Sequence, residues 1–135
     1  MVKCFEDLRA WQLARVHSQA ITALCRSESM RRDFGLIDQI SRAVGSVMDN
    51  LAEGFDRGSR GEFRQFLGYA KGSTGEVRSQ LYRAADRGYL DPATLETLLQ
   101  QNDEISRIIR GLIVSTNASP FPGSRYPKDS PSSTR

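Results

Sequence analysis

Glu53 and Glu76 are the residues of this chain best suited to acid–base chemistry. A general acid–base pair needs two carboxyl groups in one pocket, with their pKa values held apart. The sequence offers no nucleophile, electrophile or cofactor motif beside them. We therefore expect structural carboxylates that pair with arginines such as Arg42, Arg57 or Arg60, and a protein that is not an enzyme and has no catalytic residue.

Metal and phosphate sites are not expected either. His17 is the only histidine, and the paired Glu-x-x-His ligands of di-iron helical bundles are absent from the sequence. We expect it to be a hydrogen-bonded histidine of the core or its edge. Gly54, Gly58 and Gly61 lack the lysine and the preceding strand of a phosphate-binding loop. The sequence thus predicts no cofactor and no metal.

The best basic site is the cluster Arg57, Arg60 and Arg64. Asp56 and Glu62 lie beside it in the sequence, so a solvated helix start with local acidic partners is the favoured interpretation. If the protein contacts nucleic acid, we expect this cluster to make the contact.

The net charge is small and unevenly placed. The total is +3. Residues 115–135 contain three basic residues and one aspartate and so carry +2, which leaves +1 for residues 1–114. Nucleic-acid binding through such a body is expected to be weak. Charged residues are spread through the first fifteen positions, and no apolar window is long enough for a membrane span, so we expect a cytoplasmic protein with no membrane partner.

Apolar residues recur at helical spacing in four stretches, over about residues 6–26, 34–53, 59–87 and 91–114. Phe5, Leu8 and Trp11 fall outside the first stripe, and would either fold over the end of the molecule or meet another subunit. The expected helix starts are Ser59, with Glu62 completing a capping box, and Asp91 before Pro92. Glycines are expected to end the second and third helices: Gly54, Gly58 and Gly88.

Four helices with short connections predict an all-α fold, an up-down-up-down four-helix bundle over residues 1–115. Residues 116–135 are rich in serine and proline, and are predicted to be a disordered tail.

Polar residues form a second line on two of these helices. On the second helix they are Gln39, Arg42, Ser46, Asn50 and Glu53, and on the third they are Glu62, Tyr69, Ser73, Glu76 and Gln80. They are either an ordinary solvated flank or a hydrogen-bonded seam, within the bundle or between subunits.

Glycines of the third helix define a glycine face: Gly61, Gly68, Gly72 and Gly75. Each glycine inside a helix costs about 0.8–1 kcal/mol relative to alanine. Either the helix has drifted under weak selection, or something approaches this face closely. We favour the second interpretation, with the backbone of a neighbouring subunit against the glycine face.

Five short motifs occur in the order Phe5-x-x-Leu8-x-x-Trp11-Gln12, Gly35-Leu36-x-x-Gln39-Ile40, Asn50-Leu51-Ala52-Glu53-Gly54, Glu62-Phe63-x-x-Phe66-Leu67-x-x-Ala70-x-Gly72-Ser73 and Gly88-Tyr89-Leu90. In this order, over about residues 4–114, the chain resembles the bacterial family of proteins encoded in intervening sequences of 23S ribosomal RNA genes. The resemblance implies a four-helix bundle that assembles into a five-membered ring. One relative is an accessory subunit of diversity-generating retroelements, and binds a reverse transcriptase and nucleic acid through a basic surface.

The resemblance also bears on the polar lines, because Gln39, Asn50, Glu53, Ser73 and Glu76 fall on recurring motif positions of the family. It therefore favours the seam over the solvated flank. The resulting hypothesis is a non-enzymatic homo-oligomeric scaffold or accessory protein, pentameric by the resemblance, that binds itself and in addition another protein. The alternative is a nucleic-acid-associated factor that binds RNA or DNA weakly through basic surfaces.

Overall fold

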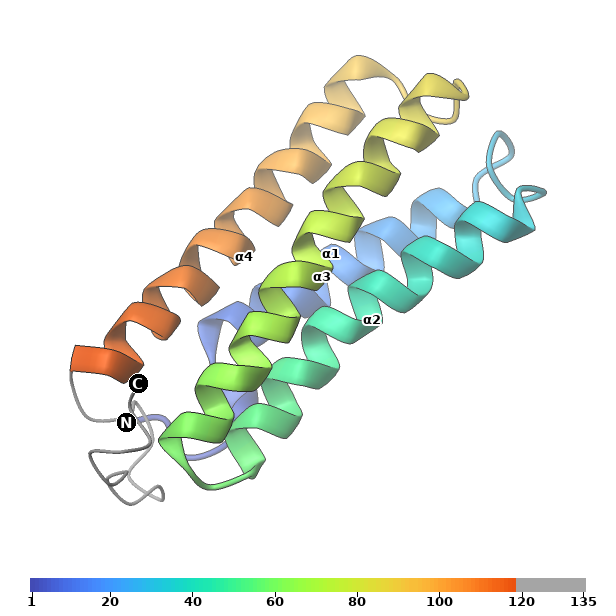
Figure 1. Cartoon of the computed structure of the whole chain (residues 1–135). Helices are drawn as coiled ribbons and strands as arrows, with labels where there is room; N and C mark the ends of the chain where they lie inside the picture. The colour runs from blue at the N-terminus through green and yellow to red at the C-terminus, as the bar shows by residue number, and fades with distance from the viewer. Residues whose placement is uncertain (119–135) are drawn as a thin grey trace.

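Four antiparallel helices form the part of the chain that the structure, a computed structural model, describes, which is residues 1–118. After a short 3-10 turn, η1 (Phe5–Asp7), the helices are α1 (Arg9–Cys25), α2 (Phe34–Asp56), α3 (Arg60–Asp86) and α4 (Pro92–Ala118). Each helix runs antiparallel to the one before it (Figure 1), so the predicted up-down-up-down bundle is confirmed. Helix α4 continues past the predicted domain end at residue 115, and the remainder of the predicted tail lies outside the described residues.

Helices α2, α3 and α4 begin where short polar side chains accept hydrogen bonds from free backbone N–H groups, whereas α1 begins after Leu8 without such a cap. The N–H of Leu36 donates to Asp33 Oδ1 at 3.2 Å, that of Glu62 to Ser59 Oγ at 3.2 Å, and that of Thr94 to Asp91 Oδ1 at 2.7 Å. The predicted caps Ser59 and Asp91 are therefore confirmed.

Glycines act in two different ways at the helix ends. Gly58 and Gly88 have positive φ values of 95° and 80°, and they end α2 and α3 as predicted. Gly54 lies inside α2, so the prediction that it ends the helix was wrong. A Cβ at Gly54 would lie 2.6 Å from Phe66 Cβ, which means that glycine is needed there for the close approach of α3.

The start of the chain differs from the predicted continuous helix. Leu8 is extended (φ −69°, ψ 122°) and separates η1 from α1. This break lets Phe5 pack edge-on against Trp11, with ring centroids 5.2 Å apart, while Leu8 is buried. The three residues therefore fold over the end of the bundle, which is the first of the two predicted alternatives.

The core consists of two apolar clusters. One surrounds the α2–α3 turn and includes Leu51, Phe55, Phe63, Leu67 and Ile109, and the other lies toward the opposite end and includes Ile21, Leu36, Ile40, Leu81 and Leu98. Between them lies a central polar layer, formed by His17, Thr74 and Asn102, all of which are buried. Asn102 Nδ2 donates to the Thr74 carbonyl at 2.9 Å.

None of the four helices, within residues 1–118, combines the length and the apolar character needed to cross a membrane.

Candidate assembly surface

The polar lines of α2 and α3 meet along the contact between these two helices. Asn50 Nδ2 donates to the Ser46 carbonyl at 2.8 Å and to Ser46 Oγ at 2.9 Å. The hydroxyl groups of Ser46 and Ser73 lie 2.8 Å apart, and Ser73 is buried. These three residues form a hydrogen-bonded seam between α2 and α3, in which Ser73 is buried and Ser46 and Asn50 are half-buried.

Nearer the start of α2, the same two lines border a groove of about 420 Å³ that is open to solvent. Arg83 donates to Gln39 Oε1 at 2.7 Å across this groove, and Arg42 is ion-paired with Asp38 at 3.1 Å. Glu76 also lines the groove. Gln39, Arg42 and Glu76 are therefore exposed surface residues, whereas the half-buried Asn50 and the buried Ser73 belong to the seam between α2 and α3.

Glu53 lies apart from Glu76, near the end of α2. Its carboxylate accepts a hydrogen bond at 2.9 Å from Arg57, the residue that follows α2, and the two side chains form an ion pair four residues apart. Glu76 faces the groove between α2 and α3, of which Glu53 is not a lining residue. The two carboxylates are thus not brought together as an acid–base pair.

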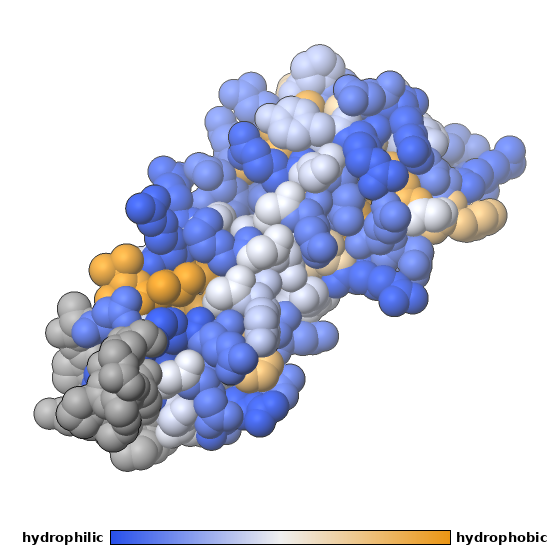
Figure 2. Space-filling model, viewed as in Figure 1, coloured by the Kyte–Doolittle hydropathy of each residue, from blue (hydrophilic) through white to orange (hydrophobic). Residues whose placement is uncertain are grey.

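The glycine face of α3 is open to solvent. Gly68, Gly72 and Gly75 are exposed, and a Cβ added at any of them would meet no atom within 4 Å. Figure 2 shows a pale stripe of intermediate hydropathy along α3, between bluer, more hydrophilic surfaces. Nothing in residues 1–118 accounts for glycine at these three positions, in contrast to Gly54, where the space is already filled by Phe66.

The arginine cluster gathers at the turn between α2 and α3. Arg57 is ion-paired with Glu53 and lies 3.6 Å from Glu62, and its guanidinium stacks over the Phe66 ring at 5.1 Å. Arg64 Nε donates to Thr116 Oγ1 of α4 at 3.2 Å. Arg60 opens α3 and is half-buried. The cluster thus contributes to the packing of the chain itself.

His17 is 3% exposed, and its Nε2–H donates to the Leu98 carbonyl at 3.0 Å. Burial lowers the pKa of His17, against a smaller opposing effect of this hydrogen bond, and so favours the neutral ring. In the described part of the chain, no three histidine, cysteine or carboxylate side chains gather in a way that could hold a metal ion. The burial of His17 and its hydrogen bond confirm that it is a hydrogen-bonded residue of the core.

One polar cluster escaped the sequence analysis, and it joins the α1–α2 loop to the α3–α4 loop. Asp33 Oδ2 accepts from Tyr89 Oη and from Arg87, each at 2.6 Å. These hydrogen bonds lower the pKa of Asp33 to about 2, and the bond from Tyr89 has the largest effect. Asp33 is a residue type that caps helices, and Tyr89 belongs to the motif Gly88-Tyr89-Leu90. Their pairing depends on the up-down order of the helices, which brings both loops to one end.

No curated protein matches the chain. A family model described as 23S rRNA-intervening sequence protein matches residues 6–111. The match runs from η1 into the last part of α4, and thus includes the seam, the groove and the glycine face. The chain belongs to the family of 23S rRNA-intervening sequence proteins.

Proposed function

We propose that the protein is a non-enzymatic, homo-oligomeric scaffold or accessory protein, and that the glycine face of α3 is part of the contact between subunits. The number of subunits in this proposal is five, in a closed ring, and rests on the family resemblance. A further part of the proposal is a cytoplasmic location, which suits the free thiols of Cys4 and Cys25.

The observation that carries the proposal is the open space above Gly68, Gly72 and Gly75. Three glycines in a helix lower its stability by about 2–3 kcal/mol relative to alanine. In an isolated chain, no contact from residues 1–118 offsets this loss. A second backbone packed closely against α3 would offset it, since glycine permits an approach that any side chain prevents.

The test is to replace Gly72 by leucine and to compare it with a matched exposed glycine on another helix. Gly111 of α4 is exposed and also has no atom within 4 Å of an added Cβ. Gly72→Leu should keep the helical circular dichroism spectrum but lower the mass measured by light scattering, whereas Gly111→Leu should keep both. A monomeric wild type would refute the assembly, and an oligomeric Gly72→Leu would refute the role of the glycine face.

Weak nucleic-acid binding is the second candidate function. The observation in its favour is that Arg57, Arg60 and Arg64 lie at one end of the bundle, at the turn between α2 and α3. A ring would repeat this basic site once per subunit, and repetition raises the avidity of weak contacts. The ion pairs of Arg57 with Glu53 and Glu62 reduce the positive charge available to bind phosphate groups, so the scaffold remains the first proposal.

A further inference from the structure

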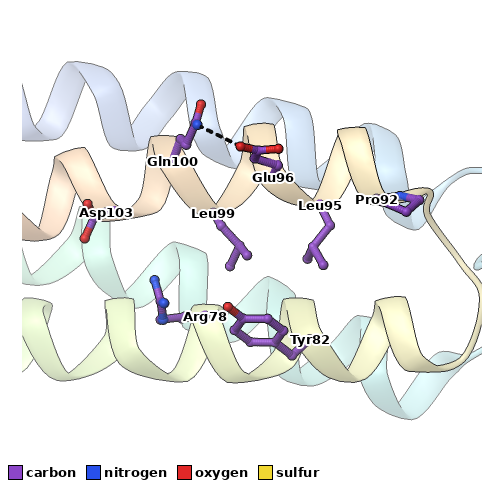
Figure 3. A pocket seen from close by; sticks show the side chains of 8 residues that line it. All are labelled: Arg78, Tyr82, Pro92, Leu95, Glu96, Leu99, Gln100 and Asp103. Carbon is purple, nitrogen blue, oxygen red and sulfur yellow. Dashed lines mark hydrogen bonds between the residues drawn. The ribbon is translucent and has the colours of Figure 1, made fainter.

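A second groove, of about 510 Å³, lies between the last part of α3 and the first part of α4. Leu95 and Leu99 point from α4 toward α3, and Tyr82 points from α3 toward them (Figure 3). The Arg78 guanidinium lies 5.7 Å from the Tyr82 ring centroid, yet Tyr82 remains 43% exposed. The groove thus has an apolar and aromatic wall formed by Tyr82, Leu95 and Leu99, with charged and polar residues beside it, and its volume lies in the range that accommodates small ligands or large side chains.

The rim of this groove on α4 is acidic. Glu96 and Asp103 both line it. Asp103 is ion-paired with Arg107 at 3.4 Å. Glu96 accepts a hydrogen bond from Gln100 at 3.4 Å and forms no ion pair within residues 1–118. Arg78 lines the opposite, α3 side of the groove, so an occupant that brings an apolar side chain and a positive charge at the α4 rim would fit.

Phe34, the first residue of α2, is such an apolar side chain. It is 76% exposed and belongs to neither core cluster, so residues 1–118 of its own chain bury little of it. Two arginines precede it, of which Arg31 is ion-paired with Glu28 at 2.9 Å. Arg32 is exposed and forms no ion pair with any residue from 1 to 118. The tip of the molecule thus presents an aromatic ring beside an uncompensated positive charge.

We propose that Phe34 of one copy of this chain inserts into the groove between α3 and α4 of a second copy, with Arg32 facing Glu96. Tyr82 follows Gly75 by seven residues on α3, so the groove continues the glycine face at its α4 side. The inference rests on the proposed homo-oligomer and names the side chains that join its subunits. The contact uses two different surfaces of the chain, and such head-to-tail contacts generate rings when the rotation closes.

The first test compares two exposed apolar residues. Val16 on α1 is 54% exposed and serves as the control for Phe34. Removal of a buried aromatic anchor from an interface should raise the concentration at which the oligomer dissociates by about tenfold or more. In a dilution series followed by light scattering, Phe34→Ala and Tyr82→Ala should both show this shift, whereas Val16→Ala should dissociate like the wild type. Helical circular dichroism spectra of all variants confirm that the subunits fold.

The second test reverses the charges. Arg32→Glu and Glu96→Arg should each weaken the oligomer, and the variant that carries both changes should regain much of the wild-type dissociation profile. A wild type that is monomeric would refute the proposed function itself. An oligomeric wild type whose dissociation is unchanged by Phe34→Ala and by both charge reversals would overturn this inference alone, and would leave the scaffold proposal standing.

Discussion

Replacement of Gly54 by alanine should destabilise the bundle, although alanine is the better helix former. In an open helix this change gains about 1 kcal/mol. Here the new Cβ would lie 2.6 Å from Phe66 Cβ and 3.4 Å from Phe63 Cδ1. Since Phe66 Cβ is attached directly to the α3 backbone, rotation of the ring brings no relief, and α2 and α3 must separate by about 1 Å to restore ordinary contact distances.

The expected cost follows from the packing around this contact. Phe55 and Phe63 are fully buried and meet edge-to-face, with centroids 5.9 Å apart, so a separation of the two helices also disturbs this pair. Overpacking of a well-packed core costs about 1–3 kcal/mol. After the gain in helix propensity is subtracted, Gly54→Ala should lower the free energy of unfolding by about 1 kcal/mol, and by no more than about 2.

Gly45 provides the control in the same helix, because an added Cβ there meets no atom within 4 Å. Gly45→Ala should raise the free energy of unfolding by up to about 1 kcal/mol. Urea denaturation followed by circular dichroism, at one fixed protein concentration, measures both changes. In a Phe66→Ala background the penalty at Gly54 should largely persist, since alanine keeps the Cβ. Equal stabilisation by the two alanines would refute the argument from close approach.

Three further predictions concern charge and pH. Because the folded chain holds the pKa of Asp33 at about 2, below the value of 3.8 for an unperturbed aspartate, its contribution to stability is present above about pH 4 and is lost as the pH falls toward 2. Asp33→Asn should thus unfold at a lower urea concentration than the wild type at pH 7, and the gap should narrow on acidification; a constant gap would contradict the assigned role of the carboxylate. Burial lowers the pKa of His17 below its unperturbed value of 6.5, so protons favour the unfolded chain and stability should fall as the pH drops below about 6.5. His17→Gln should remove this part of the pH dependence, and the single histidine resonance in NMR spectra of the wild type should titrate below pH 6.5. Generic duplex DNA should bind weakly and dissociate with added salt, since few phosphates are neutralised by each subunit; a sub-micromolar, sequence-selective complex that persists at about 0.2 M salt would reverse the order of the two proposed functions.

The fold was predictable because its determinants are local in sequence. Helical periodicity, the caps Ser59 and Asp91, and the positive φ of Gly58 and Gly88 all depend on residues within a few positions of one another. The role of Gly54 was not predictable, because it arises from the approach of a different helix. A glycine near the end of a helical pattern looks the same in sequence whether it ends the helix or admits a neighbour.

The candidate surface was predictable only in part, for a related reason. Helical spacing placed the polar residues of α2 on one line, but it did not separate Asn50 in the interior seam from Arg42 at the open groove. Likewise, the helical spacing of apolar residues over 91–114 did not separate the buried Leu98 from Leu95 and Leu99, which are half-buried and line the groove of Figure 3. Such differences depend on how far adjacent helices diverge, which no single helix specifies.

The central polar layer fixes how far α4 can slide along α1 and α3. A slip of α4 by one turn, about 5.4 Å, would exchange one leucine or isoleucine for another in the two apolar clusters. The same slip would take Asn102 from the Thr74 carbonyl and the Leu98 carbonyl from His17, and each buried donor left without an acceptor costs about 1–3 kcal/mol. The layer thus converts a stack of interchangeable apolar contacts into one permitted alignment. The hydrogen bond between Ser46 and Ser73 ties α2 to α3 in turn, so Phe34 on α2 and its proposed receptor on α3 and α4 are held at a constant offset, and identical copies can repeat the same contact.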